Sequence, residues 1–433
     1  MHTQVISHTS EEKKNDYEIE RKKLTVRGLS GLKNQGNTCY MNSIIQCLAS
    51  LDLFRTWMVS KSFKKRLYYN YGIKLVDKIR KDNKFDQTKK IKINQSDLEQ
   101  FSQNSIVYRL AEVFENMWKQ NCYITPQKLK DKIGESCESF RGYRQHDSQE
   151  LLNEILDKIH EETKAEVIVY PEMTSGVNEY LYELKKCNSI MNDPLATPED
   201  KEQAYYIFCE YKKNHVVDAI TASSIQFWRS YVSKSHSIIT DLFTGLFYSK
   251  IVCKECGLVS GSFEPFTTLS VPTKEDGETS IDESIREFIK EEILSGDNQY
   301  FCDHCKKKVD ATKKMCIWEP PNILIVHLKR FKNDRYGSTK TSSKVIFPTD
   351  NLDIQSYLSD LHNVKNTTYK LTSISEHRGT CNFGHYVAYC QNSINNKWYE
   401  FNDDSVYHVP DDELAKEIVT KNAYILLYTR IFE

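Results

Sequence analysis

Apolar residues recur at helical spacing through the first third of the chain. After a glycine-rich loop that ends in Thr38-Cys39, they fall at i, i+3, i+4 and i+7, at Met41, Ile44, Ile45 and Leu48. Residues 106–118 and 147–160 repeat this spacing. An apolar face of this period is typical of a helix that packs against a core. We therefore predict that helices dominate this part, and that Cys39 stands at the beginning of one of them.

The second half has a different pattern. Short apolar or alternating runs, bounded by turn residues, occupy residues 246–252, 323–331, 371–376, 383–390, 397–401 and 424–428. Such runs predict strands that are buried on one face or on both. The whole pattern indicates an α+β protein whose second half is mainly β.

Two regions stand apart from these elements. Residues 60–94 hold twelve Lys or Arg against three Asp, and part of this stretch is expected to be helical. A solvated lysine-rich face explains the composition, and a polyanion-binding patch is the alternative. Residues 161–235 are rich in charged and aromatic side chains, with a helical run over 199–213. We expect an added helical region there, without chemistry of its own.

The composition excludes several classes of protein. With 433 residues, of which 39% are hydrophobic, the chain is long enough for a large globular core. Its 59 basic and 60 acidic residues give a formal charge of -1, so no global charge favours nucleic acid or an anionic membrane. A run of about 18 apolar residues, which a membrane span needs, is absent from the sequence.

The N-terminal segment and the cysteines suggest a compartment. Residues 1–27 mix charges and polar groups, and we expect a flexible segment rather than a secretory signal. Thirteen cysteines without such a signal argue for a reducing compartment, cytosol or nucleus. There, cysteines act as core residues, metal ligands or nucleophiles.

Two cysteine pairs have the spacing of a metal site. Cys253 and Cys256 form the first C-x-x-C pair, and Cys302 and Cys305 form the second. Four thiolates from two such knuckles suit one tetrahedral Zn²⁺ of the structural type, which stabilises hairpins too thin to have their own core. Reduced core cysteines are the alternative, and His304 is an alternative ligand.

Cys39, at a helix start, and a hairpin near the C-terminus together offer the residues of a catalytic site. Backbone N–H groups and the macrodipole favour the thiolate at such a position. If Cys390 pairs with Lys397 across the hairpin, His385 lies opposite Asn402, and a bulge would bring Asp403 there instead. A cysteine, a histidine and a carboxamide are what a thiol acyl transferase needs as nucleophile, base and orienting group. Taken alone, each residue is as well explained by a structural role.

Several separated blocks resemble the ubiquitin-specific proteases. The run 31–43, GLKNQGNTCYMNS, resembles the cysteine box of that family, and GHYVAY (384–389) with WYEFND (398–403) resembles its histidine box. Further matches are YRQHDSQEL (143–151), DLFTG (241–245) and HLKRF (327–331). All follow the family's order, and the resemblance extends over about residues 28 to 430.

The resemblance implies a fold and a domain organisation. The fold is α+β and papain-like, described as thumb, palm and fingers, with a zinc ion at the tip of a β fingers lobe. The catalytic domain then covers residues 28–433, with a mainly helical thumb at 28–165 that carries the basic insertion 60–94. A helical insertion at 166–235, fingers at 236–320 and a palm at 321–433 complete it.

The resemblance also implies roles in the chemistry. Cys39 matches the nucleophile, His385 the base and Asn402 the third member of the triad. Asp403 matches the adjacent acid. Asn34 matches a side chain that helps to hold the oxyanion, where one amide N–H contributes roughly 3 kcal/mol.

A third set of residues matches substrate-binding positions. Asp147, with Gln145 and Glu150, lies where the family places a carboxylate against the basic tail of ubiquitin. Since Glu150 follows Asp147 by three residues at a helix start, a capping box is the structural alternative, and both roles are compatible. Residues 377–382 resemble a gate beside the tail channel, with His377 expected at the surface of that loop.

The function implied is that of a deubiquitinating thiol protease. It would hydrolyse (iso)peptide bonds at the C-terminal glycine of ubiquitin, hold one structural Zn²⁺ and take ubiquitin or ubiquitinated proteins as partners. A protease for a ubiquitin-like modifier shares every motif and is one alternative, and a non-catalytic ubiquitin-binding module is another. The near-neutral charge and the three candidate catalytic residues argue against a zinc-finger nucleic-acid binder. The need for an activating partner stays open.

Overall fold

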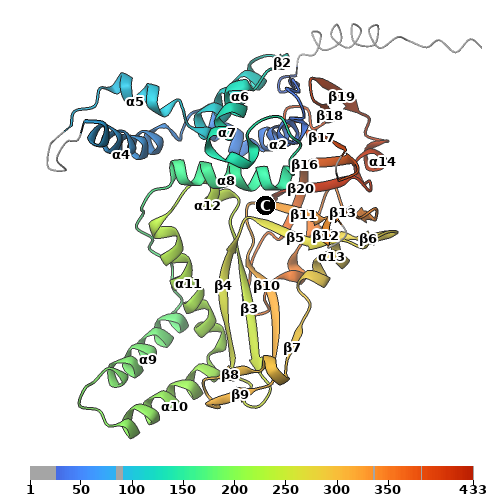
Figure 1. Ribbon diagram of the computed structural model, residues 1–433. Helices are drawn as coiled ribbons and strands as arrows, with labels where there is room; N and C mark the ends of the chain where they lie inside the picture. Colours follow the sequence, from blue (N-terminus) through green and yellow to red (C-terminus); the bar gives the residue numbers. More distant parts are fainter. Residues whose placement is uncertain (1–25, 84–90, 335–336, 382, 433) are drawn as a thin grey trace, which may run out of the picture. The chain divides into compact units, whose positions relative to one another are not determined.

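The computed structural model describes residues 26–83, 91–334, 337–381 and 383–432 (Figure 1). The chain divides into two compact units. Unit 1 comprises the residues up to 163 with 330–344 and 372–427, and unit 2 comprises 164–329, 345–371 and 428–433. Of the expected flexible segment, residues 1–25 lie outside the described residues. None of the described helices is long and apolar enough to cross a membrane.

Unit 1 contains the helices of the first third of the chain. They are α2 (Cys39–Ser50), α3 (Asp52–Val59), α4 (Lys64–Asn83), α5 (Gln95–Ser102), α6 (Ile106–Lys119), α7 (Gln127–Ser136), the 3-10 turn η1 (Glu138–Phe140) and α8 (Ser148–Thr163), followed much later by α14 (Leu414–Ile418). Every residue of α2 is buried, which makes it the central helix of this unit. The helices predicted behind Cys39, at 106–118 and at 147–160, and within 60–94 are confirmed.

The strands of unit 1 bring the C-terminal segments against α2. β16 (Thr368–Gly379), β17 (Gly384–Gln391), β18 (Trp398–Asn402) and β19 (Ser405–Val409) are successive antiparallel neighbours, and β20 (Ala423–Arg430) follows on the other side of β16. Two small pairs are β1 (Gly31–Leu32) with β2 (Tyr123–Ile124), and β12 (Phe331–Asp334) with β13 (Gly337–Lys340). Because α2 packs against β17, the helix that begins at Cys39 is fixed against the strand that carries His385.

A buried carboxylate ties three helices of unit 1 together. Glu162, near the end of α8, accepts hydrogen bonds from the backbone N–H groups of Ile106 and Val107 at 3.0 and 2.8 Å. The first N–H groups of α6 thereby find the partners that the helix itself cannot supply. Glu162 also accepts from the Tyr71 hydroxyl of α4 at 2.8 Å. The basic helix of the 60–94 insertion is thus anchored to the core.

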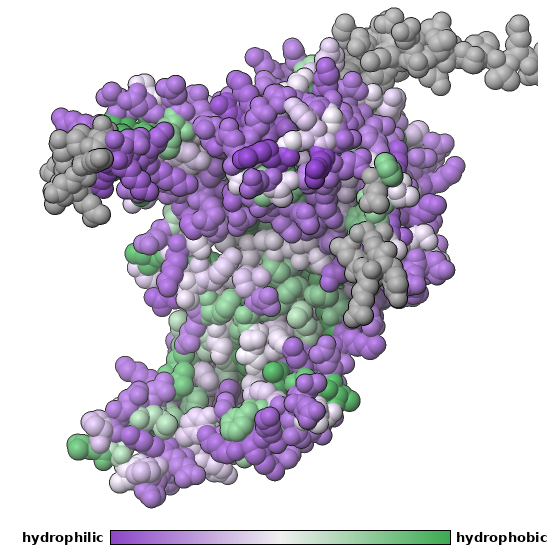
Figure 2. Space-filling model, in the orientation of Figure 1, coloured by the Kyte–Doolittle hydropathy of each residue, from purple (hydrophilic) through white to green (hydrophobic). Residues whose placement is uncertain are grey.

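Unit 2 combines helices with an antiparallel sheet. Its helices are α9 (Ser175–Met191), α10 (Pro198–Asn214), α11 (Val216–Lys234), α12 (Ile238–Leu242) and α13 (Ile281–Phe288). Its sheet has the order β4 (Val259–Phe266), β3 (Gly245–Cys253), β10 (Ala311–Glu319) and β7 (Glu292–Leu294). Two separate two-stranded pairs are β6 (Glu278–Ser280) with β14 (Lys344–Ile346) and β8 (Tyr300–Cys302) with β9 (Lys307–Val309). In addition, β5 (Thr268–Pro272) runs parallel to β11 (Ile323–Lys329), and β15 (Leu352–Asp353) pairs with the start of β16. Figure 2 shows apolar side chains gathered over β3, β4 and β10.

The helical character predicted for residues 161 to 235 is confirmed, since this region forms α9, α10 and α11. Thr197 and Asp200 form a reciprocal capping box at the start of α10, and Pro198 is its first residue. The ends of the insertion meet, since Ala165 and His236 exchange backbone hydrogen bonds of 2.9 and 3.0 Å. The insertion therefore leaves and rejoins unit 2 at a single place.

Candidate active site and four-cysteine cluster

Cys39 is the first residue of α2, as predicted, and its side chain is buried at 2% exposure. Thr38 occupies the N-cap position, but its hydroxyl makes no cap hydrogen bond and accepts instead from the backbone N–H of Gln35 at 2.9 Å. The N–H groups of the first turn and the macrodipole therefore act at the position of the Cys39 sulfur.

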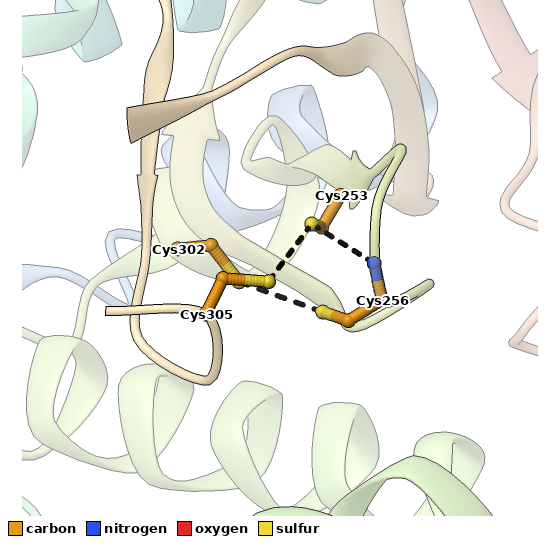
Figure 3. Close-up of side chains that lie close together, drawn as sticks. All are labelled: Cys253, Cys256, Cys302 and Cys305. Carbon is orange, nitrogen blue, oxygen red and sulfur yellow. Dashed lines mark hydrogen bonds between the residues drawn. The ribbon is translucent and has the colours of Figure 1, made fainter. Parts of the chain in front are cut away.

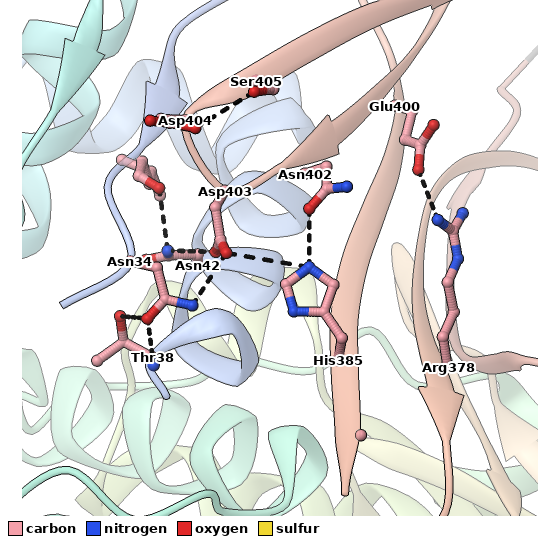
Figure 4. Close-up of polar contacts among 12 residues, drawn as sticks. Asn34, Thr38, Asn42, Arg378, His385, Glu400, Asn402, Asp403, Asp404 and Ser405 are labelled. Atoms are coloured by element: carbon pink, nitrogen blue, oxygen red, sulfur yellow. Dashed lines mark hydrogen bonds and ion pairs between the residues drawn. The ribbon is translucent and has the colours of Figure 1, made fainter. Parts of the chain in front are cut away.

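The ring of His385 hydrogen-bonds to both Cys39 and Asn402, and Figure 4 shows the contact with Asn402. Its Nε2 lies 2.7 Å from Asn402 Oδ1. Since an amide oxygen can only accept, Nε2 carries the hydrogen, and Nδ1 is left to face Cys39. The hydrogen bond with Cys39, followed by that with Asn402, raises the pKa of His385 to about 9 against the opposing effect of partial burial. The three residues that the sequence suggested as a triad are thus brought together.

The predicted pairing of Cys390 with Lys397 is wrong. Cys390 pairs with Tyr399, and the Lys397 carbonyl accepts from the backbone N–H of Asn392 at 2.9 Å. The hairpin closes two residues further along because Asn396, at φ 56°, turns the chain through the left-handed region. A slip of two residues leaves each side chain on its original face of the sheet. The base and its amide therefore still meet, as diagonal rather than direct neighbours.

Asp403 organises the polar side of the site (Figure 4). Its Oδ2 accepts from Asn34 Nδ2 at 2.9 Å, and its Oδ1 accepts from Asn42 Nδ2 at 2.8 Å. The same Oδ2 lies 3.9 Å from His385 Nε2. Asp403 has a φ of 52°, a conformation that Asp and Asn adopt more readily than most residues. Asn402 therefore makes the short bond to the base, and Asp403 lies beside that pair.

Asn42 is a site residue that the sequence analysis missed. Besides Asp403, its amide donates to the backbone carbonyl of Leu32 at 3.0 Å. One side chain of α2 thus holds both β1 and the loop after Asn402. The signal in the sequence was its spacing, since it follows Cys39 by three residues and so lies on the same face of the helix.

Asn34 shapes the loop that leads to Cys39. Its Oδ1 accepts from the backbone N–H groups of Gly36 and Thr38 at 3.1 and 3.0 Å. Gly36 has a φ of 96°, where a side chain would be strained. Within the described part of the chain, Asn34 Nδ2 has one acceptor, Asp403, for its two hydrogens.

Gln145 and Glu150, two of the suggested substrate-binding residues, are both exposed. Gln145 donates to the Gly384 carbonyl at 2.7 Å, directly before His385 in the sequence. Glu150 lies in the first turn of α8. A contact of either residue with a substrate stays a prediction.

Asp147 immediately precedes α8 and is mostly enclosed. Its Oδ1 accepts from the backbone N–H of Gln149 at 2.7 Å, so Asp147 caps the start of α8, and the reciprocal bond of Glu150 in a capping box stays a prediction. Its Oδ2 accepts from the Tyr424 hydroxyl at 2.6 Å. Burial raises the pKa of Asp147, although these hydrogen bonds oppose that effect.

The expected surface position of His377 is wrong. β16 continues as far as Gly379, and His377 is buried at 2% exposure. Its ring centroid lies 4.6 Å from that of Tyr386 and 5.1 Å from that of Phe331, and burial lowers its pKa to about 4. A Cβ atom at Gly384 would collide with this ring. The polar loop sequence gave no sign of these distant apolar partners.

The four suggested metal ligands form one cluster in unit 2 (Figure 3). Their sulfur atoms all lie within 4.8 Å of one another, with Cys253 Sγ 3.9 Å from Cys305 Sγ and Cys256 Sγ 3.6 Å from Cys302 Sγ. Each pair is followed by a residue with positive φ, Gly257 at 72° and Lys306 at 54°. The two C-x-x-C segments therefore make matching turns, and their four thiols suit a single soft metal ion. The alternative ligand His304 directs its Nε2 to Glu210 Oε1, at 2.9 Å.

A comparison with protein families identifies the chain. The family model described as ubiquitin carboxyl-terminal hydrolase matches residues 30–428. The chain belongs to this family. It is thereby classed as a cysteine-type ubiquitin hydrolase, and the resemblance drawn from the sequence blocks is confirmed.

Individual hydrolases of this family are similar over most of the chain. A probable ubiquitin carboxyl-terminal hydrolase of Acanthamoeba polyphaga mimivirus is 32% identical, with 93% of this chain and 90% of that protein covered. Ubiquitin carboxyl-terminal hydrolase 2 of Gallus gallus is 30% identical, with coverages of 94% and 95%. Its Homo sapiens counterpart is 29% identical over 93% of this chain, which spans 55% of that longer protein.

Solved structures share the fold of this hydrolase. A chain of the SAGA Ubp8/Sgf11/Sus1/Sgf73 DUB module bound to ubiquitin aldehyde matches with a TM-score of 0.60 and 23% identity, and 96% of this chain and 71% of that one are covered. The module bound to monoubiquitin gives a TM-score of 0.61 and 22% identity, with coverages of 99% and 77%. The predicted α+β, papain-like fold with thumb, palm and fingers is confirmed.

Proposed function

We propose that the chain is a deubiquitinating thiol protease that hydrolyses (iso)peptide bonds at the C-terminal glycine of ubiquitin. The observation that carries this proposal is the His385 ring, which hydrogen-bonds to Cys39 and lies 2.7 Å from Asn402. A nucleophile, a base and a group that fixes the tautomer of the base are sufficient for acyl transfer through a thiol ester. Ubiquitin as the substrate is supported by the names of the relatives and by the ubiquitin bound in the similar structures.

The reaction has two halves. In the first, the Cys39 thiolate attacks the glycyl carbonyl carbon, and the imidazolium of His385 gives its Nδ1 proton to the departing amine. The C–N bond breaks and a thioester remains on the sulfur. In the second, neutral His385 takes a proton from water, the hydroxide attacks the thioester, and the ubiquitin carboxylate leaves as the thiolate is restored.

Asn34 is proposed to help hold the oxyanion of both tetrahedral intermediates. Its amide is kept in place through Asp403, which accepts one hydrogen from Nδ2 at 2.9 Å, and the second hydrogen supplies the donor. An amide N–H aimed at developing negative charge contributes roughly 3 kcal/mol. Asp403 acts through Asn34 and Asn42 as a positioning residue.

The tail of ubiquitin is proposed to meet Asp147, Gln145 and Glu150. Asp147 and Gln145 are each held by a hydrogen bond that links a segment near residue 145 to a C-terminal strand. These bonds would preorganise the acidic and amide groups for a basic, extended peptide. Glu150 adds an exposed carboxylate on the same helical turn as the Asp147 cap.

The four-cysteine cluster is proposed to hold one Zn²⁺. Cys253, Cys256, Cys302 and Cys305 offer four sulfur atoms within 4.8 Å of one another, which fits the tetrahedral preference of that ion. Four thiolates leave no open position, so the ion, when bound, supplies stability to the β8–β9 hairpin and to the end of β3 rather than catalysis.

The compartment and the domain division complete the proposal. All thirteen cysteines are free thiols, which suits the cytosol or the nucleus. The division into a thumb at 28–165, fingers at 236–320 and a palm at 321–433 stays a prediction, and so does any partner of the insertions at 60–94 and 166–235.

Hydrolysis of a fluorogenic ubiquitin C-terminal amide tests the proposed function. The wild type should release the fluorophore, and Cys39→Ala should not, while Cys137→Ala, at a partly exposed cysteine outside the site, serves as the matched control and should keep its activity. The same assay with ubiquitin-like modifiers in place of ubiquitin tests the modifier. Turnover of such a modifier without turnover of ubiquitin would contradict the substrate assignment.

A further inference from the structure

Helix α10 of the insertion contacts the second cysteine knuckle directly. His304 stands between Cys302 and Cys305, and its Nε2 lies 2.9 Å from Glu210 Oε1 and 3.1 Å from Lys213 Nζ. Glu210 and Lys213 also pair with each other at 2.7 Å. When Nε2 carries the hydrogen it donates to Glu210, and in the other tautomer it accepts from Lys213. Either tautomer therefore has a partner on α10.

Aromatic residues extend this contact to both sides of Cys305. The Tyr206 ring lies 5.8 Å from the His304 ring, centroid to centroid. The Lys306 ammonium lies 4.0 Å from the centre of the Tyr205 ring, within the range of a cation–π interaction. Tyr206, Glu210 and Lys213 are spaced i, i+4 and i+7, so they share one face of α10. This face holds His304, and the adjoining Tyr205 contacts Lys306 on the other side of Cys305.

Apart from α10, the knuckle is held by short strands, a small buried cluster and an ion pair of Lys307 with Glu255 at 2.8 Å. β8 and β9 are three residues each, and the buried cluster beside them consists of Cys253, Leu258, Cys302 and Val309. The turn after Cys305 places Lys306 at φ 54°, which a residue with a side chain adopts at some cost. Among the described residues, no hydrogen-bond partner reaches His304 Nδ1. The polar contacts of His304 therefore all run to α10.

The helix that makes these contacts is held independently of the knuckle. The buried residues Val177, Tyr180, Ala219 and Ala222 pack α9 against α11, with Phe208 of α10 against them. α11 in turn reaches the sheet through Phe227, whose ring centroid is 6.2 Å from that of Phe263 in β4. α10 is thus supported from the sheet side and can act as a fixed template for the loop that carries Cys302 and Cys305.

We propose that the helical insertion braces the zinc knuckle, with Glu210 and Lys213 as positioning residues that hold His304 and so keep two of the four sulfur atoms in place. This inference rests on the proposed zinc site and gives the 166–235 insertion a role that the family fold does not require. Groups that orient ligand-bearing loops influence metal retention about tenfold or more when they are removed. The brace acts on how long the metal stays bound, and not on which residues bind it.

Zinc release from the zinc-loaded 433-residue chain tests the brace. Zinc content is measured first, and the rate of transfer to an excess of 4-(2-pyridylazo)resorcinol is then followed for the wild type, Glu210→Gln and His304→Phe. The matched control is Glu202→Gln, the same change at an exposed position two turns earlier on α10. We expect release about tenfold faster in Glu210→Gln and His304→Phe, no change in the control, and no further acceleration in the double variant. Unchanged far-ultraviolet circular dichroism shows that α10 itself is intact.

Two results would overturn the inference in distinguishable ways. If the wild type contains zinc and both variants release it at rates within twofold of the control, the zinc site is supported and the brace is contradicted. A folded wild type that contains no zinc would contradict both the zinc site and the brace. If Glu210→Gln loses helical structure, Lys213→Met takes its place, because it leaves the Glu210–His304 contact and should accelerate release, though less than His304→Phe. A release rate of Lys213→Met within twofold of the control would then contradict the brace.

Discussion

His385 Nε2 donates to Asn402 Oδ1 at 2.7 Å, although Phe401 is the last residue of β18 that pairs with β17. The amide thus meets the base just where the two strands cease to pair. This diagonal contact fixes the tautomer of His385 and leaves its Nδ1 for Cys39. The candidate active site depends on this relationship more than on any other.

The pH dependence of activity follows from His385. Its pKa is raised to about 9 by hydrogen bonds with Cys39 and Asn402, so the imidazolium that donates a proton to the leaving amine persists well above its ordinary 6.5. We expect kcat/KM to fall as pH rises through about 9. The charged ring contributes fully to the free energy of unfolding below pH 6.5, and this contribution is lost as pH rises through about 9.

In Asn402→Ala, the fall of kcat/KM at alkaline pH should occur at a lower pH than in the wild type. The value of kcat should also fall about tenfold to hundredfold, because the ring loses an acceptor and its orientation. The measurement is a pH–rate profile with the fluorogenic ubiquitin amide, and Asn214→Ala at an exposed helix end is the control. A fall at the wild-type pH in Asn402→Ala would show that the amide does not set the protonation of His385.

Asp403→Asn tests the positioning role of the carboxylate. The change keeps the shape of the side chain but replaces one carboxylate oxygen by an NH₂ group. This group then faces the NH₂ of either Asn34 or Asn42, both of which donate to Asp403. Loss of one charge-assisted hydrogen bond costs about 1.5 kcal/mol or more, so kcat/KM should fall roughly tenfold. The control is Asp411→Asn, at an exposed position. Wild-type kinetics in Asp403→Asn would leave the carboxylate with no part in the site.

Asp147 is expected to serve both stability and substrate binding. Asp147→Ala removes the cap on Gln149 N–H and the acceptor of the Tyr424 hydroxyl, so the free energy of unfolding should fall by about 1–2 kcal/mol. Tyr424→Phe keeps the carboxylate and should cost about 1 kcal/mol. Denaturant unfolding measures both. If the carboxylate also contacts the ubiquitin tail, KM rises in Asp147→Ala and not in Tyr424→Phe; an equal KM in the two variants speaks against that contact.

The pattern of the sequence predicted the element types better than their pairing. Helical spacing located α2, α6 and α8, because α6 and α8 each bury one regular face and α2 is buried on all sides. The β17–β18 register could not be predicted, since it depends on the left-handed turn at Asn396 rather than on apolar periodicity. The shared face of His385 and Asn402 survived that error because side chains alternate with a period of two.

The parts of the site that were missed depend on long-range contacts. Asn42 donates to Asp403, more than 360 residues away in sequence, through an amide that looks ordinary in its own segment. His377 is buried by Phe331 and Tyr386, so the polar loop around it was misleading. Short motifs carry local geometry, whereas partners supplied by other segments become evident only in the folded chain.

Loss of one cluster cysteine should release the metal. Cys302→Ser removes one of four sulfur atoms that lie within 4.8 Å of one another, and zinc content should fall well below one ion per chain with a lower midpoint of thermal unfolding. Cys137→Ser, a partly exposed cysteine outside the cluster, is the control and should keep its zinc. Elemental analysis reads out both variants, and an unchanged zinc content in Cys302→Ser would sink the metal site.

The most direct test of the central claim is the reaction of Cys39 with a ubiquitin that carries a thiol-reactive group at its C-terminus, followed by intact-protein mass spectrometry. We expect the wild type to gain the mass of one ubiquitin, Cys47→Ala in the same helix to gain it as well, and Cys39→Ala to gain none. An adduct that persists in Cys39→Ala, or a folded wild type that forms none, would contradict the assignment of Cys39 as the nucleophile for ubiquitin.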